Sequence, residues 1–236
     1  TMEQRLLGSL ATSAQGLGCM GLATVYGRVD PAEARATLDA AIEAGVTMLD
    51  TADMYGNGVS ETFVGEAIKG RRDNLVIATK TGILTRRVTG MPKGLDGRPA
   101  HIRTALDKSL RRLGTEVIDL YYLHRVDPRV PIEESVGAIG DLVAQGKVRH
   151  VGVSETTAAQ LRRAHATHPI TAVQLEWSLF TRDLEREVLP AARELGIGVV
   201  AYSPLGRGML TGSPQATTTL PLIDYRRFLQ RWRRAN

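Results

Sequence analysis

Cysteine, histidine and long apolar runs are scarce in this chain of 236 residues, which contains one cysteine and five histidines. One cysteine, Cys19, cannot form an internal disulfide, and this scarcity is compatible with a reducing compartment. No stretch approaches the ~18 apolar residues of a membrane span, and the first residues lack the apolar segment of a signal peptide. We therefore expect a cytoplasmic protein that does not associate with membranes.

The histidines do not form a recognisable metal site. Metal ions in proteins are held by several ligands, often at short, paired spacings. His124 has no partner at such a spacing among His101, His150, His165 and His168. The sequence therefore predicts no metal centre.

The chain is basic, with a formal net charge of +5 and a pI near 9.6, a balance that can indicate nucleic-acid binding. Much of the excess positive charge lies in the final segment, and the rest of the chain is nearly neutral. The basic residues there are Arg226, Arg227, Arg231, Arg233 and Arg234. We interpret the segment as a solvated face or a loop beside a cofactor, and we expect no nucleic-acid partner.

The composition suits one folded domain. With 43% hydrophobic residues the chain can bury a full core, and no linker divides it. We therefore treat residues 1–236 as one domain, in which residues 211–236 form a basic and loosely ordered tail.

Short apolar runs alternate with helical patterns along the chain. The runs are 46–49, 75–79, 117–123, 150–153, 172–175 and 197–201, each followed by polar or aromatic residues. Runs that are apolar along most of their length are typical of parallel strands covered on both faces. The helical patterns begin near Pro31, Ser60, Ile102, Pro131, Thr156 or Thr157, and Asp183. Alternation with short links predicts a wholly parallel α/β fold.

Both an open doubly wound sheet and a closed barrel fit this alternation. Polar residues after every strand favour a (β/α)₈ TIM barrel, which collects its chemistry from the carboxyl ends of many strands. Residues 16–21 match the G-x-G-x-x-G pattern, but residues 10–15 are small and polar and no helix follows at once. We therefore interpret residues 16–21 as a first barrel strand rather than a dinucleotide-binding turn.

No apolar run after Thr211 marks an eighth strand. The predicted fold is therefore a (β/α)₈ barrel that lacks its eighth strand–helix unit in the chain given.

Four side chains at strand ends suggest acid–base chemistry: Asp50, Tyr55, Lys80 and His124. A phenol titrates near ~10, and a buried ammonium beside it stabilises the phenolate and lowers its pKa. Lys80 can supply that charge to Tyr55, and Asp50 can keep the lysine protonated in a dry pocket. His124 can donate a hydrogen bond to a carbonyl oxygen. Such a site protonates an oxygen while another group attacks the carbon.

Several segments of the chain resemble the signature segments of the aldo-keto reductases. They are Leu49–Gly56 (LDTADMYG), Thr79–Thr81 (TKT), Asp119–Arg125 (DLYYLHR), Gly152–Ser154 (GVS) and Ala201–Gly208 (AYSPLGRG). They follow the family's order near its spacing, and the resemblance extends from about Gly16 to Thr211.

The resemblance implies a barrel that binds NADPH across its mouth and reduces aldehydes or ketones. It implies that Tyr55 is the general acid, that Asp50 and Lys80 tune it, and that His124 orients the carbonyl. Further implied cofactor contacts are Ser154 and Gln174 to the nicotinamide carboxamide, Tyr202 stacked on its ring, and Ser203, Pro204, Leu205, Gly206 and Arg207 along the pyrophosphate.

The sequence does not name the substrate. The side chains expected to contact it are Tyr26, Met54, Arg125 and Trp177, which suggest a partly apolar site with one anion contact. Met54 and Trp177 are equally consistent with core or rim positions. The alternative function is a non-catalytic NADPH-sensing subunit of the potassium-channel β type, which can retain the same four residues. The oligomeric state stays open.

The family's segment that holds the adenosine 2′-phosphate is not found in this sequence. We therefore expect the chain to bind NADPH weakly and with little preference over NADH.

Overall fold

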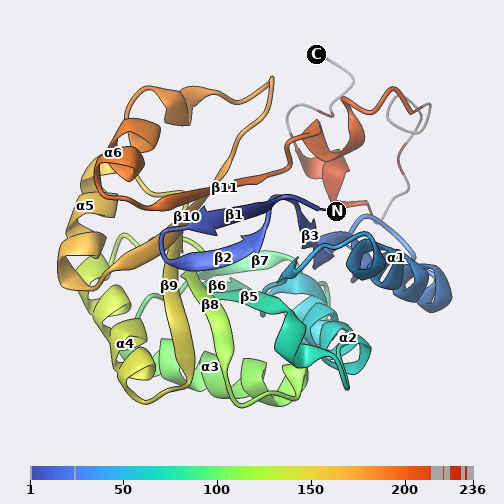
Figure 1. The fold of residues 1–236 in the computed structure, drawn as a ribbon, viewed down its shortest axis with the longest axis horizontal. Coiled ribbons are helices and arrows are strands. Elements are labelled where there is room, and N and C mark those ends of the chain that lie inside the picture. The colour runs from blue at the N-terminus through green and yellow to red at the C-terminus, as the bar shows by residue number, and fades with distance from the viewer. Residues whose placement is uncertain (1, 24, 214–219, 221–223, 230–231, 233–236) are drawn as a thin grey trace.

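The computed structural model describes residues 2–23, 25–213, 220, 224–229 and 232. Its main body is one sheet of seven parallel strands with helices packed on the outside (Figure 1). In spatial order the strands are β11 (Gly198–Tyr202), β10 (Ile170–Glu176), β9 (Val148–Ser154), β8 (Ile118–Leu123), β5 (Val76–Thr81), β4 (Met48–Asp50) and β3 (Gly16–Gly18). Within the described residues no eighth strand joins β11 to β3, so the prediction of an incomplete (β/α)₈ barrel is confirmed.

The six α-helices of the described chain follow the predicted pattern. They are α1 (Pro31–Glu43), α2 (Val59–Ala67), α3 (Pro99–Leu113), α4 (Ile132–Ala144), α5 (Ala158–Thr167) and α6 (Val188–Glu194). The Asp30 carboxylate caps α1 by accepting from the Ala32 N–H, and Thr157 forms a capping box with Gln160 at α5. Gly114 ends α3 in the left-handed conformation. None of the described helices is both long and apolar enough to span a bilayer.

Two predicted elements are shorter in the structure than expected. The first strand ends at Gly18, and Cys19–Leu22 is a short 3₁₀ helix. The helix expected over residues 183–195 is interrupted: Asp183–Glu185 is a 3₁₀ turn, and α6 begins only at Val188. The backbone of Glu187 is the reason for the break, because its φ of −131° and ψ of −47° lie outside the helical range.

A hairpin that was not predicted from the sequence closes one end of the barrel. Strands β1 (Gln4–Leu7) and β2 (Leu10–Ser13) pair antiparallel through a turn at Gly8, whose φ is +55°. Ser13 and Thr47 exchange two backbone-to-hydroxyl hydrogen bonds of 2.8 Å just before β4. At Gly198 a Cβ would lie 2.4 Å from Leu7 Cα, so the hairpin packs tightly on the start of β11. It therefore covers the amino ends of the strands.

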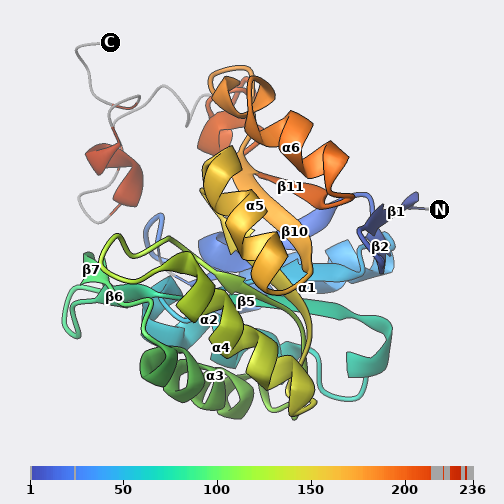
Figure 2. The same cartoon turned by 90° about the vertical axis from the view of Figure 1, so that its left-hand side faces the viewer.

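A second antiparallel hairpin, β6 (Ile83–Thr85) with β7 (Pro92–Leu95), was also not predicted. It follows β5 directly, so it lies at the carboxyl ends of the strands. Figure 2 shows it at the opposite end of the molecule from β1 and β2, on the same side as the short helix Tyr225–Phe228. The two hairpins thus lie at the amino and the carboxyl ends of the barrel strands.

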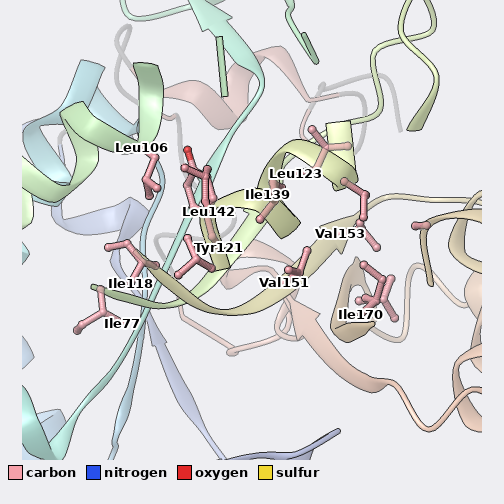
Figure 3. Packing of buried hydrophobic residues seen from close by; sticks show 14 of the residues in the cluster. Ile77, Leu106, Ile118, Tyr121, Leu123, Ile139, Leu142, Val151, Val153 and Ile170 are labelled. Atoms are coloured by element: carbon pink, nitrogen blue, oxygen red, sulfur yellow. The ribbon is translucent and has the colours of Figure 1, made fainter. Parts of the chain in front are cut away.

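The strands have two buried faces with different partners. Ile118, Tyr121, Leu123 and their neighbours on β9 pack outward against α3 and α4 (Figure 3). A smaller cluster fills the inside of the barrel and consists of Leu7, Met48, Ala78, Leu120, Tyr122 and Ala172. Because successive side chains of a strand point to opposite faces, this inner set fixes which later residues point inward.

Candidate active site

The residues at the carboxyl end of the barrel continue the inner face. Each lies two positions after an inward-facing residue, which is the strand period. The pairs are Met48 and Asp50, Ala78 and Lys80, Tyr122 and His124, Gly152 and Ser154, and Ala172 and Gln174. Gly152 is required there, because a Cβ at this position would lie 2.4 Å from the Tyr122 ring. Because side chains alternate along each strand, these polar side chains all point into the barrel, above the inner apolar cluster.

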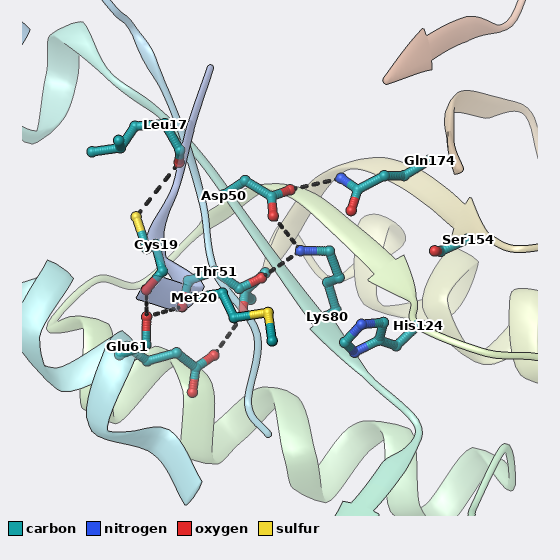
Figure 4. A network of polar contacts seen from close by, with 12 residues as sticks. Leu17, Cys19, Met20, Asp50, Thr51, Glu61, Lys80, His124, Ser154 and Gln174 are labelled. Atoms are coloured by element: carbon teal, nitrogen blue, oxygen red, sulfur yellow. Dashed lines mark hydrogen bonds and ion pairs between the residues drawn. The ribbon is translucent and has the colours of Figure 1, made fainter. Parts of the chain in front are cut away.

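Lys80 is the centre of the hydrogen-bond network (Figure 4). Its side chain is fully buried; the ammonium pairs with the Asp50 carboxylate and donates to the Thr51 carbonyl oxygen at 2.8 Å. The second oxygen of Asp50 accepts from the Gln174 amide at 2.8 Å. The carboxylate is thus fixed from two strands, and the expected contact between Asp50 and Lys80 is present.

Tyr55 lies in the turn after β4, at the start of the 3₁₀ helix Tyr55–Gly58. The Lys80 ammonium nitrogen is 5.3 Å from the centroid of its ring. His124 meets the same ring edge-on, with centroids 6.0 Å apart and planes at 82°. The structure therefore brings together all four residues that the sequence singled out.

The charges set the protonation of this group. Burial alone lowers the pKa of Lys80, but Asp50 and Tyr55 outweigh burial and the pKa is raised above its ordinary value. Burial, with Lys80 and Arg125, holds the pKa of His124 well below its usual range, so the ring is neutral at neutral pH and has one N–H donor. The site therefore combines a charged lysine with a neutral histidine.

The expected net direction for Tyr55 was wrong. Burial raises the pKa of this phenol, and the opposing effect of Lys80 does not cancel it. The physical reason is desolvation, which disfavours the charged phenolate in a dry site. In the protein as described, Tyr55 is a protonated donor at neutral pH.

A cavity of about 690 Å³ opens over these residues. Asp50, Tyr55 and His124 line it, whereas Lys80 lies beneath them. Of the residues expected at a cofactor, the cavity wall includes Ser154, Gln174, Tyr202, Ser203 and Arg207 but not Pro204, Leu205 or Gly206.

Some of the residues expected to contact a substrate line the cavity and one does not. Tyr26, Met54 and Arg125 line the cavity. Trp177 does not: its ring packs against the core between sheet and helices, and its indole N–H donates to Glu185 at 2.9 Å. The structure thus places Trp177 in the supporting packing.

Residues near the C-terminus also reach the cavity. Tyr225 and Phe228 line the wall, and the Tyr225 N–H donates to the Val25 carbonyl at 3.1 Å. The Arg226 guanidinium pairs with buried Asp224 and lies 5.3 Å from the Tyr26 ring centroid. Of the two interpretations of the basic segment, these residues fit the loop beside the cavity. Arg231, Arg233 and Arg234 lie outside the described residues.

A second buried network lies beside the Tyr55 turn. The Glu61 carboxylate accepts from the Thr79 hydroxyl and from the Arg112 guanidinium, both at 2.6 Å. Burial and the charge of Glu61 raise the pKa of Asp53 to about 7. The Arg112 guanidinium pairs with Glu61 and only partly offsets the rise in the pKa of Asp53. The sequence analysis did not predict this network. Among the described residues no group of three or more His, Cys, Asp or Glu side chains could hold a metal ion.

The family description "Aldo/keto reductase family" matches residues 15–224 of the chain. The chain belongs to the aldo/keto reductase family. The family consists of oxidoreductases, so the chain is an oxidoreductase. Its described fold is an incomplete (β/α)₈ barrel.

Three solved structures are similar to this aldo/keto reductase. The holo form of an aldo-keto reductase from Bacillus halodurans is 36% identical, with a TM-score of 0.82 over 91% of this chain and 70% of the other. A glycerol dehydrogenase from Gluconobacter oxydans is 33% identical, with a TM-score of 0.86 over 99% and 72%. A thermostable aldo-keto reductase in complex with the inhibitor epalrestat is 32% identical, with a TM-score of 0.77 over 91% and 76%.

Proposed function

We propose that the protein reduces aldehydes or ketones to alcohols by hydride transfer from NADPH, with Tyr55 as the general acid. The observation that carries this proposal is the arrangement around Tyr55. A buried ammonium lies 5.3 Å from its ring centroid and a neutral imidazole 6.0 Å away, at the wall of one large cavity. This is the set of groups that carbonyl protonation requires: a proton donor, a charge to stabilise the resulting phenolate, and a hydrogen-bond donor to orient the oxygen.

The cavity wall also fits a nicotinamide dinucleotide chemically. Ser154 and Gln174 offer hydroxyl and amide groups for a carboxamide, and Tyr202 offers a ring for stacking. The Arg207 guanidinium donates to the Tyr26 hydroxyl at 2.7 Å and suits a phosphate, which guanidinium groups bind well.

The backbone of the same segment supports this assignment. Ser203 and Arg207 have positive φ values of 50° and 59°, which are uncommon for residues other than glycine. Such backbone strain tends to occur where a protein holds a ligand. The proposed cofactor contacts are Ser154, Gln174, Tyr202, Ser203, Pro204, Leu205, Gly206 and Arg207.

Each residue of the reacting group has a distinct role in this proposal. NADPH, when bound, supplies the hydride. The Tyr55 hydroxyl gives its proton to the carbonyl oxygen, and the Lys80 ammonium stabilises the phenolate that remains. Asp50 keeps Lys80 charged, and His124 donates a hydrogen bond to the carbonyl oxygen before proton transfer.

The test is turnover. The 236-residue chain is mixed with NADPH and a simple aldehyde such as butanal, with NADH in a parallel reaction, and the loss of reduced cofactor and the alcohol product are both measured. We expect alcohol to form in step with cofactor oxidation. Binding of NADPH without reduction of a panel of aldehydes and ketones would instead identify a non-catalytic nucleotide-sensing subunit.

A further inference from the structure

The cavity contains one charged group that the roles above do not use. Arg125 follows His124 at the end of β8 and lines the cavity with Tyr55. Its Nη1 donates to the His124 carbonyl oxygen at 2.7 Å and to the Ser154 hydroxyl oxygen at 3.1 Å. Every acceptor recorded for it within the described part of the chain is neutral. The guanidinium is therefore held in place without having its charge balanced.

Two other partly buried arginines have carboxylate partners, whereas Arg207 on the same cavity wall donates to the Tyr26 hydroxyl. Arg112 pairs with buried Glu61 at 2.6 Å, and Arg72 pairs with buried Asp119 at 2.7 Å. These pairings are expected, since a charge removed from water is costly unless it is paired. Arg125 and Arg207 depart from that pattern, and both line the cavity.

The other charges on the cavity wall are already assigned. Among the residues that the structure describes, Asp50 and Arg207 are the remaining charged side chains that line it. Asp50 is paired with Lys80, and Arg207 is assigned to the cofactor phosphate in the proposed function. This leaves one uncompensated positive charge, next to His124, where the substrate carbonyl would be bound. A cavity with such a charge attracts anions.

We propose that Arg125 binds a carboxylate carried by the substrate, so that the preferred substrates are aldehydes or ketones with an ionised carboxyl group; this rests on the proposed function. The two recorded bonds use only Nη1. A guanidinium has five N–H donors, and those on Nη2 and Nε can pair with both oxygens of one carboxylate. Met54 and Ile83 supply apolar wall for the carbon chain between the two polar ends.

The experiment compares two substrates of similar length, succinic semialdehyde and butanal, with NADPH. The value of kcat/KM for each is measured in the parent chain and in Arg125→Met, Arg125→Lys and Arg103→Met. Arg103 is the matched control, because it pairs with Asp141 on exposed helical surface at 2.8 Å. We expect the parent to prefer succinic semialdehyde. Arg125→Met should reduce that preference by roughly 10- to 100-fold, the effect of one lost charge-assisted bond, mainly through KM. Arg125→Lys should keep part of the preference, and Arg103→Met all of it.

A binding measurement separates this inference from the proposed function. Calorimetric titration of succinate should show binding to the parent chain that Arg125→Met weakens and Arg103→Met does not. If neither aldehyde is reduced, the proposed function fails while the succinate titration still decides the role of Arg125. Equal kcat/KM for both aldehydes with an unchanged ratio in Arg125→Met overturns the inference. So does a loss of NADPH affinity in Arg125→Met without a change in the ratio, because the guanidinium would then act on the cofactor.

Discussion

The ammonium nitrogen of Lys80 lies 5.3 Å from the ring centroid of Tyr55 and at the same time pairs with Asp50. One buried charge thus links a carboxylate on β4 to a phenol in the turn that follows. Asp50 raises the pKa of Lys80 against the effect of burial, and Lys80 in turn opposes the effect of burial on Tyr55. The protonation of the three groups is therefore coupled, and a titration reports the set rather than one residue.

Replacing Tyr55 by phenylalanine should abolish most carbonyl reduction and leave cofactor binding nearly intact. The variant lacks the hydroxyl that transfers the proton, a role whose removal typically costs ~10²–10⁴-fold in rate. Steady-state rates and a fluorescence titration of NADPH measure the two effects. Tyr121→Phe is the control, since that buried side chain lies on the outer face of β8 and does not line the cavity. Activity of Tyr55→Phe within a few-fold of the parent would remove Tyr55 from its role.

Lys80→Met should slow reduction and move the pH–rate profile to higher pH. The ammonium is the main group that lowers the pKa of Tyr55 against burial, so its loss leaves burial and Asp50 to raise that pKa further. For reduction, which needs the protonated phenol, the fall in rate at alkaline pH should begin later. For alcohol oxidation, which needs the phenolate, the rise in rate should begin later. An unchanged midpoint in both directions would contradict the proposed coupling.

Asp53→Asn should make the protein more stable above neutral pH. The pKa of Asp53 is about 7 in the folded chain and ~3.9 when unfolded, so between these values the folded state binds more protons. Stability contributed by the protonated acid is therefore lost as pH rises through about 7. Urea unfolding over a pH series should show a smaller decline across this window in the variant. An identical decline in parent and variant would show that Asp53 does not titrate there.

Asp96→Asn should change the pH dependence of stability in the opposite direction, because the pKa of Asp96 is lowered in the folded chain. The hydrogen bond from the Arg98 side chain lowers the pKa of Asp96 to about 2, so its contribution is present above the unfolded value of ~3.9 and is lost as pH falls toward 2. Asp96→Asn should therefore alter only the acid side of the same unfolding series, and Arg98→Met should have a similar effect.

Gly65→Ala should destabilise the fold, whereas Gly137→Ala should not. A Cβ at Gly65 would lie 2.6 Å from the Arg112 carbonyl oxygen and 2.8 Å from Leu113, so helices α2 and α3 would have to separate. Forcing atoms into a packed contact costs ~1–3 kcal/mol. At Gly137 in α4 the nearest contact is 3.9 Å away, and alanine there should stabilise the helix by ~0.5–1 kcal/mol. Thermal and urea unfolding test both, and a neutral Gly65→Ala would contradict the close packing.

Local patterns in the sequence were sufficient for the main elements. The strand ending at Leu123 is apolar along most of its length, and from Leu120 onward its residues alternate between the inner and outer cores. The start of α1 near Pro31 could be predicted, because capping depends on the few residues next to the cap, here Asp30. The same strand period aligned Asp50, Lys80 and His124, and so the candidate site could be predicted from short segments.

The turns and hairpins were harder to predict for a physical reason. The β1–β2 hairpin has only four residues in each strand, too few for a strong alternation. Its stability comes from distant contacts, such as Leu7 against Gly198 and Ser13 with Thr47. The break before α6 likewise depends on the backbone conformation of Glu187 rather than on composition.

The sequence by itself determined the order of strands and helices, the family signature and the four residues around Tyr55, because each of these depends on neighbours within a few positions. Only the tertiary structure decided that burial outweighs Lys80 in setting the pKa of Tyr55, that Asp53 lies near Glu61, and that Arg125 has only neutral partners. A pKa or an unbalanced charge is the sum of burial and of every charge nearby. Those charges come from segments far apart in the chain, which only folding brings together.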